Sequence, residues 1–294
     1  MADGAAIGWI VSYPKSGNTW LRLMLLGLIG GGQPIDINGL GNEVGTASQS
    51  EFDELLVVPS GELFPDERIA AQPALNRAIA AETGEGLILR KVHDRYWHVP
   101  GGEAVFPSSV SRGAVYLVRD PRDVAVSFAH HRGTTPDETI ATMADPAATL
   151  SAAGDRHRKH LAQPLGTWSG HVLSWLNQRD IPVLLLRYED LLADPAWSLR
   201  LVADHLRIAH DSASVARVVD ATRFGRLQAQ EQVQGFRERQ AGSTAPFFRQ
   251  GRAGSWRGVL AQAQAARILA DHGPVMRWLG YDCGDSGTDP ERYA

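Results

Sequence analysis

The chain has 294 residues, enough for one large domain or two small ones with a substantial core. Its net charge of −4 argues against the strongly basic surface of a dedicated duplex-binding protein. The one cysteine, Cys283, excludes a disulfide framework and a cysteine-based zinc site, and it is typical of a reducing compartment. Only Lys15, Lys91 and Lys159 of the 29 basic residues are lysines, so each lysine is a candidate for a special role.

No segment predicts export or membrane insertion. Residues 1–6 have no basic cluster, and the apolar run 7–13 is too short for a signal-peptide core. The apolar run 21–29 falls short of the roughly 20 residues that span a bilayer, so it indicates a buried helix. We therefore expect a soluble, cytoplasmic protein.

Short apolar runs alternate with helical patterns, which is typical of a parallel sheet flanked by helices. The runs that predict strands cover residues 7–13, 86–92, 113–118 and 182–187. Helical patterns cover residues 17–28, 121–131, 165–179 and 195–208, and the chain beyond residue 211 is expected to be helical without strands. Loops are expected at residues 30–61, 133–153 and 234–254. No composition break divides the chain, so we predict a single α/β domain over residues 1–294.

The first predicted strand runs directly into residues 13–20, Tyr-Pro-Lys-Ser-Gly-Asn-Thr-Trp. A strand, a tight glycine turn and a helix N-terminus together form an anion site, because free N–H groups converge there and the helix dipole favours negative charge. The Walker pattern G-x-x-x-x-G-K-[ST] is absent, since Lys15 precedes the glycine. The alternative is an ordinary strand–helix turn with a solvated lysine.

Two further strand ends carry polar residues that belong at the same edge of the sheet. Arg119 follows the third strand and can hold a phosphate with its forked guanidinium, and Ser127 lies about two turns into the next helix. Lys91 and His93 end the second strand with one residue between them, so both can face one cleft. The alternatives are a salt bridge from Arg119 to a neighbouring aspartate and a structural role for His93.

Three motifs, in this order, resemble those of the sulfotransferases that use 3′-phosphoadenosine-5′-phosphosulfate (PAPS). They are residues 13–20, residues 118–127 (Val-Arg-Asp-Pro-Arg-Asp-Val-Ala-Val-Ser) and residues 248–256 (Phe-Arg-Gln-Gly-Arg-Ala-Gly-Ser-Trp). The resemblance implies a central parallel sheet flanked by helices, a P-loop-like loop for the 5′-phosphosulfate and a helical C-terminal part.

The resemblance also implies residue roles. His93 would be the general base, Lys15 would stabilise the leaving group, and Lys91 would hold the sulfuryl oxygens. The residues implied to bind PAPS are Lys15, Ser16, Gly17, Asn18, Thr19, Trp20, Arg119, Ser127, Tyr188, Thr222, Phe224, Arg249, Gln250 and Gly251. The residues that we expect in the acceptor pocket, closed by residues 133–164 and 234–248, are Tyr96, Trp97, Phe106, Phe128 and His131.

The chain departs from the family pattern at three positions. Asn18 replaces a commoner threonine, Gln250 replaces a lysine, and Ser255 replaces an acidic residue. No dimerisation motif is recognisable after Trp256, which leaves the oligomeric state open, and Lys159 has no assigned role.

We therefore expect direct in-line sulfuryl transfer from PAPS to a hydroxyl, or alternatively an amine, of a small molecule. The product nucleotide would be 3′-phosphoadenosine-5′-phosphate (PAP), with no metal, nucleic acid or membrane required. Two alternatives remain. A P-loop kinase would need a magnesium-holding carboxylate, for which Asp120 is the candidate. A non-catalytic sensor would bind the desulfated nucleotide without turnover.

Overall fold

The apolar runs of the chain form the parallel sheet that the sequence predicts. The computed structural model describes residues 6–40, 48–83, 86–150, 161–239 and 246–283. Its central sheet has the order β2-β1-β3-β6, and all neighbouring strands are parallel. The strands of this sheet are β1 (Ala6–Ser12), β2 (Leu87–Val92), β3 (Ser111–Val118) and β6 (Val183–Arg187). A separate antiparallel pair is formed by β4 (Thr149–Leu150) and β5 (Gln163–Pro164).

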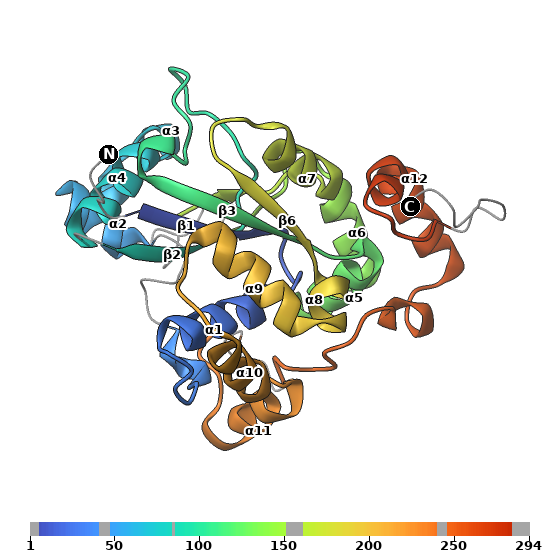
Figure 1. Cartoon of the computed structure of the whole chain (residues 1–294). Coiled ribbons are helices and arrows are strands. Elements are labelled where there is room, and N and C mark those ends of the chain that lie inside the picture. Colours follow the sequence, from blue (N-terminus) through green and yellow to red (C-terminus); the bar gives the residue numbers. More distant parts are fainter. Residues whose placement is uncertain (1–5, 41–47, 84–85, 151–160, 240–245, 284–294) are drawn as a thin grey trace.

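Helices cover both faces of the sheet (Figure 1). One face carries α1 (Asn18–Ile29), α9 (Pro195–Leu206) and α10 (Ser212–Ala221). The helices that pack with the other face are α4 (Gln72–Thr83), α5 (Pro121–Arg132), α6 (Pro136–Ala144), α7 (Trp168–Asn177) and α12 (Gln262–Trp278). The remaining helices are α2 (Gln49–Leu56), α3 (Pro65–Ala70), α8 (Tyr188–Ala193) and α11 (Phe224–Gln234).

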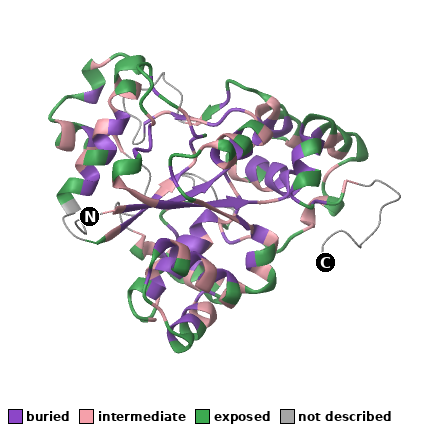
Figure 2. Ribbon diagram, turned by 45° about the horizontal axis from the view of Figure 1, so that its top comes forward, coloured by how far each residue is buried: buried purple, intermediate pink, exposed green. Residues whose placement is uncertain are grey.

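Alternation along β1 explains why the sheet has two cores. Ile7, Trp9 and Val11 face the α5–α7 side, whereas Ile10 faces α1 and α9. All four side chains are buried, and the sheet is buried between its two helical layers (Figure 2). The continuous apolar runs of the sequence therefore reflect strands that are covered on both faces.

The strand order places a crevice at one edge of the sheet. The chain passes from β1 to β2 on one side of β1 and to β3 on the other. The helices that follow β1 and β3, α1 and α5, pack on opposite faces. Their N-termini therefore diverge around the carboxyl ends of β1 and β3, where open α/β sheets bind ligands.

The predicted strands and helices agree with the structure to within a few residues, but two predicted loops contain helices. The stretch 30–61 contains α2, in which only Phe52 is buried, so the sequence shows little apolar periodicity there. The stretch 133–153 contains α6, which begins with a capping box between Thr135 and Glu138. Lys159, and parts of the predicted closing loops 133–164 and 234–248, lie outside the described residues.

Candidate active site

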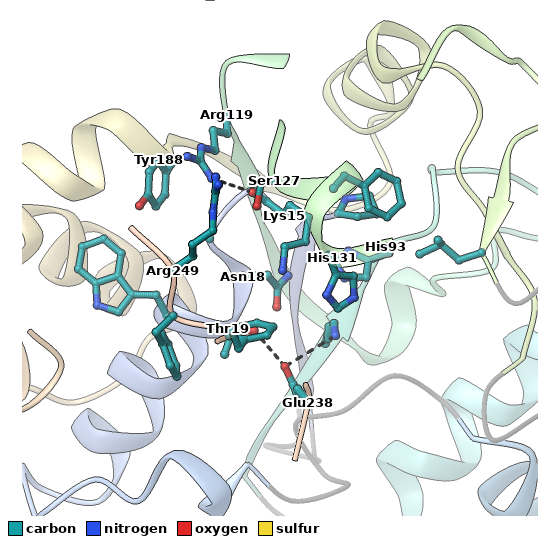
Figure 3. A pocket seen from close by; sticks show the side chains of 18 of the residues that line it. Lys15, Asn18, Thr19, His93, Arg119, Ser127, His131, Tyr188, Glu238 and Arg249 are labelled. Carbon is teal, nitrogen blue, oxygen red and sulfur yellow. Dashed lines mark hydrogen bonds and ion pairs between the residues drawn. The ribbon is translucent and has the colours of Figure 1, made fainter. Parts of the chain in front are cut away.

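A cavity of about 1360 Å³ lies where β1, β2 and β3 end (Figure 3). The structure brings most of the predicted site residues to its wall. They are Lys15, Gly17, Asn18, Thr19, Trp20, Lys91, His93, Arg119, Ser127, Phe128, His131, Tyr188, Phe224, Arg249, Gln250 and Gly251. The predicted residues that do not line it are Ser16, Tyr96, Trp97, Phe106 and Thr222.

The loop between β1 and α1 has the shape of an anion cradle. Lys15 has φ 69° and Gly17 has φ 101°, so the backbone turns sharply before α1 begins at Asn18. No side chain caps this helix, so the N–H groups of its first turn stay available to a bound anion. A Cβ atom at Gly17 would lie 2.6 Å from the ring of Tyr188, so this position requires glycine.

The polar side chains of this loop do not all face the cavity. Ser16 is fully buried, and its Oγ has no hydrogen-bond partner among the described residues. The Asn18 amide nitrogen donates to the carbonyl of Ile10 at 2.9 Å and to Ser12 Oγ at 3.3 Å. The side chain of Asn18 therefore ties α1 to β1, and its backbone N–H is the group left for a phosphate.

Lys15 and Lys91 carry ammonium groups that are easily deprotonated. The pKa of each is lowered to about 8, mainly by burial, and at Lys15 the positive charge of Lys91 is the second cause of this lowering. The Lys15 ammonium lies 4.3 Å from the centre of the Phe247 ring. Two partly desolvated cations at one edge of the cavity favour an anionic ligand there.

Arg119 joins the first loop to the last motif. Its guanidinium donates to the carbonyl of Lys15 at 3.2 Å and to that of Arg252 at 3.0 Å, and it lies 4.5 Å from the centre of the Tyr188 ring. Its Nε is buried without a hydrogen-bond partner among the described residues. Burial, followed by the positive charge of Arg119, lowers the pKa of Arg249, so these two arginines form a second cationic centre.

Aromatic rings line the cavity beside these arginines. The indole N–H of Trp20 donates to the carbonyl of Thr222 at 3.0 Å, and the ring of Trp20 meets that of Tyr188 edge to face. Thr222 therefore does not line the cavity itself but positions the Trp20 ring, which does. Gly251 has φ 58°, and a Cβ there would collide with the ring of Phe224. Together these rings can enclose a flat base.

The buried carboxylate of Asp123 organises the segment that follows Gly251. It accepts hydrogen bonds from the Gly254 N–H at 2.6 Å, the Ser255 hydroxyl at 2.9 Å and the Trp256 N–H at 2.9 Å. The hydroxyl of Ser255, at a position where the family has an acidic residue, therefore donates to a carboxylate of α5. Asp123 therefore fixes the end of the third motif relative to the helix that carries Ser127.

The carboxylate that a kinase would need for magnesium is already engaged. Asp120 caps α5 and accepts three hydrogen bonds from the Arg122 guanidinium, at 2.7, 2.9 and 3.2 Å. In the part of the chain that the structure describes, no group of three acidic, histidine or cysteine side chains could hold a metal ion.

His93 is held in one tautomer by its neighbour on β1. Its Nδ1 lies 2.7 Å from the carbonyl oxygen of Ser12, and a carbonyl only accepts, so Nδ1 carries the proton. Nε2 is then the unprotonated nitrogen. Burial, and next the charge of Lys91, hold the pKa of His93 well below its usual range. The imidazole is therefore a neutral base at neutral pH.

Three aromatic residues predicted to line the acceptor pocket lie elsewhere. Tyr96 and Phe106 pack against Trp175 of α7, and Phe106 also meets Trp9 of β1. Trp97 packs against the same core. Tyr96 and Phe106 therefore fill space between the sheet and α7 and do not line the cavity as predicted, and Trp97 does not line it either.

The other two predicted acceptor residues, Phe128 and His131, do line the cavity, together with polar side chains. Burial, and next the nearby lysines, lower the pKa of His131 to about 4, so its ring is neutral. Arg132, Asp145 and Gln163 also line the cavity. The cavity wall therefore carries more polar side chains than the aromatic set predicted from the sequence.

An ion pair that includes the cavity residue Glu238 is absent from the predicted site residues. Arg22 is fully buried on α1 and forms an ion pair with Glu238 at 2.7 Å. Glu238 also accepts a hydrogen bond from the Thr19 hydroxyl at 3.0 Å (Figure 3). It lies 4.0 Å from the Lys91 ammonium. These contacts hold the pKa of Glu238 at about 2 despite its burial. Arg22 is recognisable in the sequence as a basic residue inside the apolar run 21–29, but no sequence pattern marks Glu238.

Comparison with known proteins gives one consistent result. The model of the sulfotransferase domain matches residues 98–278. Cytosolic sulfotransferase 16 of Arabidopsis thaliana is 24% identical over 279 residues, which cover 88% of this chain and 72% of that protein. Sulfotransferase 1B1 of Mus musculus is 26% identical over 272 residues, which cover 89% of this chain and 79% of that protein.

Solved structures show the same fold. Mouse sulfotransferase SULT7A1 complexed with PAP superposes with a TM-score of 0.56 at 19% identity, over 92% of this chain and 85% of that one. Retinol dehydratase complexed with retinol and PAP also gives 0.56, at 18% identity, over 92% and 81%. None of the described helices is long and apolar enough to cross a membrane.

Proposed function

This chain belongs to the sulfotransferase family, whose sulfuryl donor is PAPS, and we propose that it moves the sulfuryl group to a hydroxyl, or alternatively an amine, of a small-molecule acceptor. One observation carries the residue assignment. A neutral histidine with a free Nε2 and two lysines of lowered pKa line the same cavity. A proton acceptor and a cationic anion cradle are the two parts that sulfuryl transfer requires.

The cavity suits the donor nucleotide. Two cationic centres and the α1 N-terminus match a ligand with two anionic groups, and the unpartnered Nε of Arg119 needs such a group. We assign the 5′ end to Lys15, Thr19 and the loop N–H groups. We assign the 3′-phosphate to Arg119, Ser127 and the 249–251 segment. The base lies between the rings of Trp20, Tyr188 and Phe224.

His93 takes the acceptor proton. As the acceptor oxygen forms its bond to sulfur, its proton passes to Nε2, and the imidazolium that forms keeps its hydrogen bond from Nδ1 to Ser12. The bound donor supplies the sulfuryl group, whose bond to the bridging phosphate oxygen breaks with the electron pair leaving on PAP. Lys15 and the loop N–H groups stabilise the charge that builds on that oxygen, and Lys91 orients the sulfuryl oxygens.

Transfer of label from [³⁵S]PAPS tests the proposal. A panel of phenols, alcohols, sugars and amines is incubated with the chain, and labelled product and PAP are both measured. A kinase would instead bind ATP more tightly than PAP in calorimetry. A chain that binds PAP yet labels no acceptor class would be a sensor, and the proposal would be wrong.

Two variants test the residue roles. His93→Ala should lower transfer by about 10²–10⁴-fold, and Lys15→Ala should lower it by about 10²–10³-fold. His98→Ala is the matched control, because this histidine is half exposed and lies outside the cavity. Near-normal turnover of a folded His93→Ala protein would exclude His93 as the base.

A further inference from the structure

A second histidine, which does not line the cavity, is hydrogen-bonded to the backbone of the predicted base. His171 of α7 is fully buried, and its Nε2 lies 2.9 Å from the backbone carbonyl oxygen of His93. Its Nδ1 lies 2.7 Å from the hydroxyl of Tyr116, on β3. Since the carbonyl only accepts, Nε2 carries the proton, and Nδ1 accepts from the tyrosine hydroxyl. Both ring nitrogens are therefore engaged in one fixed tautomer.

Aromatic packing fixes the plane of the His171 ring. The ring of Tyr13 meets it edge to face at 5.4 Å, and the ring of Tyr116 lies tilted at 5.6 Å. Burial lowers the pKa of His171 to about 4, so this ring stays neutral when the predicted base takes up a proton. A rigid, neutral donor is the kind of group that can hold a backbone in place without competing for that proton.

The backbone carbonyl of His93 needs a hydrogen-bond donor from outside the sheet. Pairing between β1 and β2 reaches Val11 and Val92, and β2 ends immediately before His93. The carbonyl of His93 therefore has no partner in this ladder and faces the fully buried ring of His171, and an unpaired carbonyl beside buried groups is costly. His171 supplies its partner from another element. The base is consequently fixed at two points, the ring by Ser12 and the peptide by His171.

We propose that His171, oriented by the Tyr116 hydroxyl, is a positioning residue that fixes the backbone, and through it the ring, of His93. This proposal rests on the proposed function, because it assigns His171 a role through the base of that reaction. The loss of a hydrogen-bond partner behind a metal-ligating histidine typically costs about 10–100-fold in activity, and we expect a loss of this size here by analogy. The lost quantity should be kcat, since His171 does not line the donor cavity.

Substitutions at residue 171 separate positioning from packing. His171→Leu keeps the volume and removes the donor, so we expect kcat to fall about 10–100-fold with KM for PAPS within about twofold. His171→Gln keeps an N–H at a similar reach and should recover most of kcat. Tyr116→Phe removes the orienting hydroxyl alone and should give a smaller loss. His272→Leu is the matched control: His272 is also buried, on α12, and bonds to Ser169 at 3.0 Å.

A spectroscopic readout needs no acceptor. Nitrogen-15 NMR of the folded protein should show His93 protonated at Nδ1 alone in the wild type and in His171→Gln. In His171→Leu, or in Tyr116→Phe if the leucine variant does not fold, it should show a mixture of tautomers. Either of two results would overturn the proposal. One is a folded His171→Leu protein with wild-type kcat and a single His93 tautomer. The other is an equal loss of kcat in His171→Leu and His171→Gln. Failure of the wild type to label any acceptor class would instead refute the proposed function and leave the NMR result interpretable.

Discussion

One terminal nitrogen of the Arg22 guanidinium lies 2.7 Å from both carboxylate oxygens of Glu238, a residue that lines the cavity. The pair lies among the groups that we assign to the 5′ end of the donor, since Thr19 donates to the same carboxylate and the Lys91 ammonium is 4.0 Å away. Glu238 is thus an internal anion beside the place where an external anion must bind.

Removing this negative charge should strengthen donor binding. Glu238→Gln retains one acceptor oxygen for Arg22 but not the repulsion toward a phosphate, so we expect PAP to bind about tenfold more tightly, or by about 1.4 kcal/mol. Adenosine 3′-phosphate lacks the 5′ group and should bind unchanged. Calorimetry measures both. Glu51→Gln is the control, because Glu51 also lines the cavity but pairs with Arg90. Weaker PAP binding, or an equal gain for both nucleotides, would contradict the assignment.

Donor affinity should fall as the pH rises above about 8. Lys15 and Lys91 both have pKa values lowered to about 8, so each is protonated below this pH and neutral above it. Only the protonated form attracts a phosphate, and binding should therefore take up protons near pH 8.5. Titration of PAP between pH 6.5 and 9.5, in buffers of different ionisation enthalpy, measures both effects. Lys15→Met should reduce the uptake; constant affinity across this range would show that the lysines do not contact the donor.

Loss of the Asp123 charge should weaken the 3′-phosphate site. Its carboxylate accepts three hydrogen bonds from residues 254–256, and an asparagine can replace only part of them. We expect Asp123→Asn to raise the PAP dissociation constant at least about tenfold, since hydrogen bonds to a buried charge each contribute about 1.5–3 kcal/mol. Asp194→Asn, at the N-cap of α9 and outside the cavity lining, should leave PAP affinity unchanged. Unchanged PAP binding in Asp123→Asn would show that the segment holds its shape without this acid.

Asp94 should make the fold less stable as the pH rises. Burial raises the pKa of its carboxyl from 3.8 to about 8, so the folded chain keeps a proton that the unfolded chain loses above about pH 4. The contribution of this group to folding is therefore full below pH 4 and declines until about pH 8. Asp94→Asn should remove this decline, and its advantage in urea unfolding should be larger at pH 8 than at pH 5. An equal difference at both values would show that Asp94 is ionised in the folded state.

The sequence predicted the parts of this molecule whose signal is local. Continuous apolar runs mark the strands, and the residues at their carboxyl ends, Lys15, His93 and Arg119, meet because parallel strands share an edge. The Arg22–Glu238 pair joins residues 216 positions apart, and no local pattern encodes such a contact. Composition also cannot tell which side of a strand end an aromatic ring will occupy, which is why Tyr96 and Phe106 were assigned to the wrong space.

Lys15 has φ 69°, a left-handed backbone conformation that costs a side-chain-bearing residue about 1–2 kcal/mol. Glycine would enter the same turn freely, so Lys15→Gly should fold more stably than Lys15→Ala while lacking the same ammonium. Equal transfer rates in these two variants would assign the whole loss to the missing charge. A higher rate in one of them would measure how much the stiffness of the turn contributes. The chain therefore holds, at a single position, a compromise between the ease of folding and the placement of one charge.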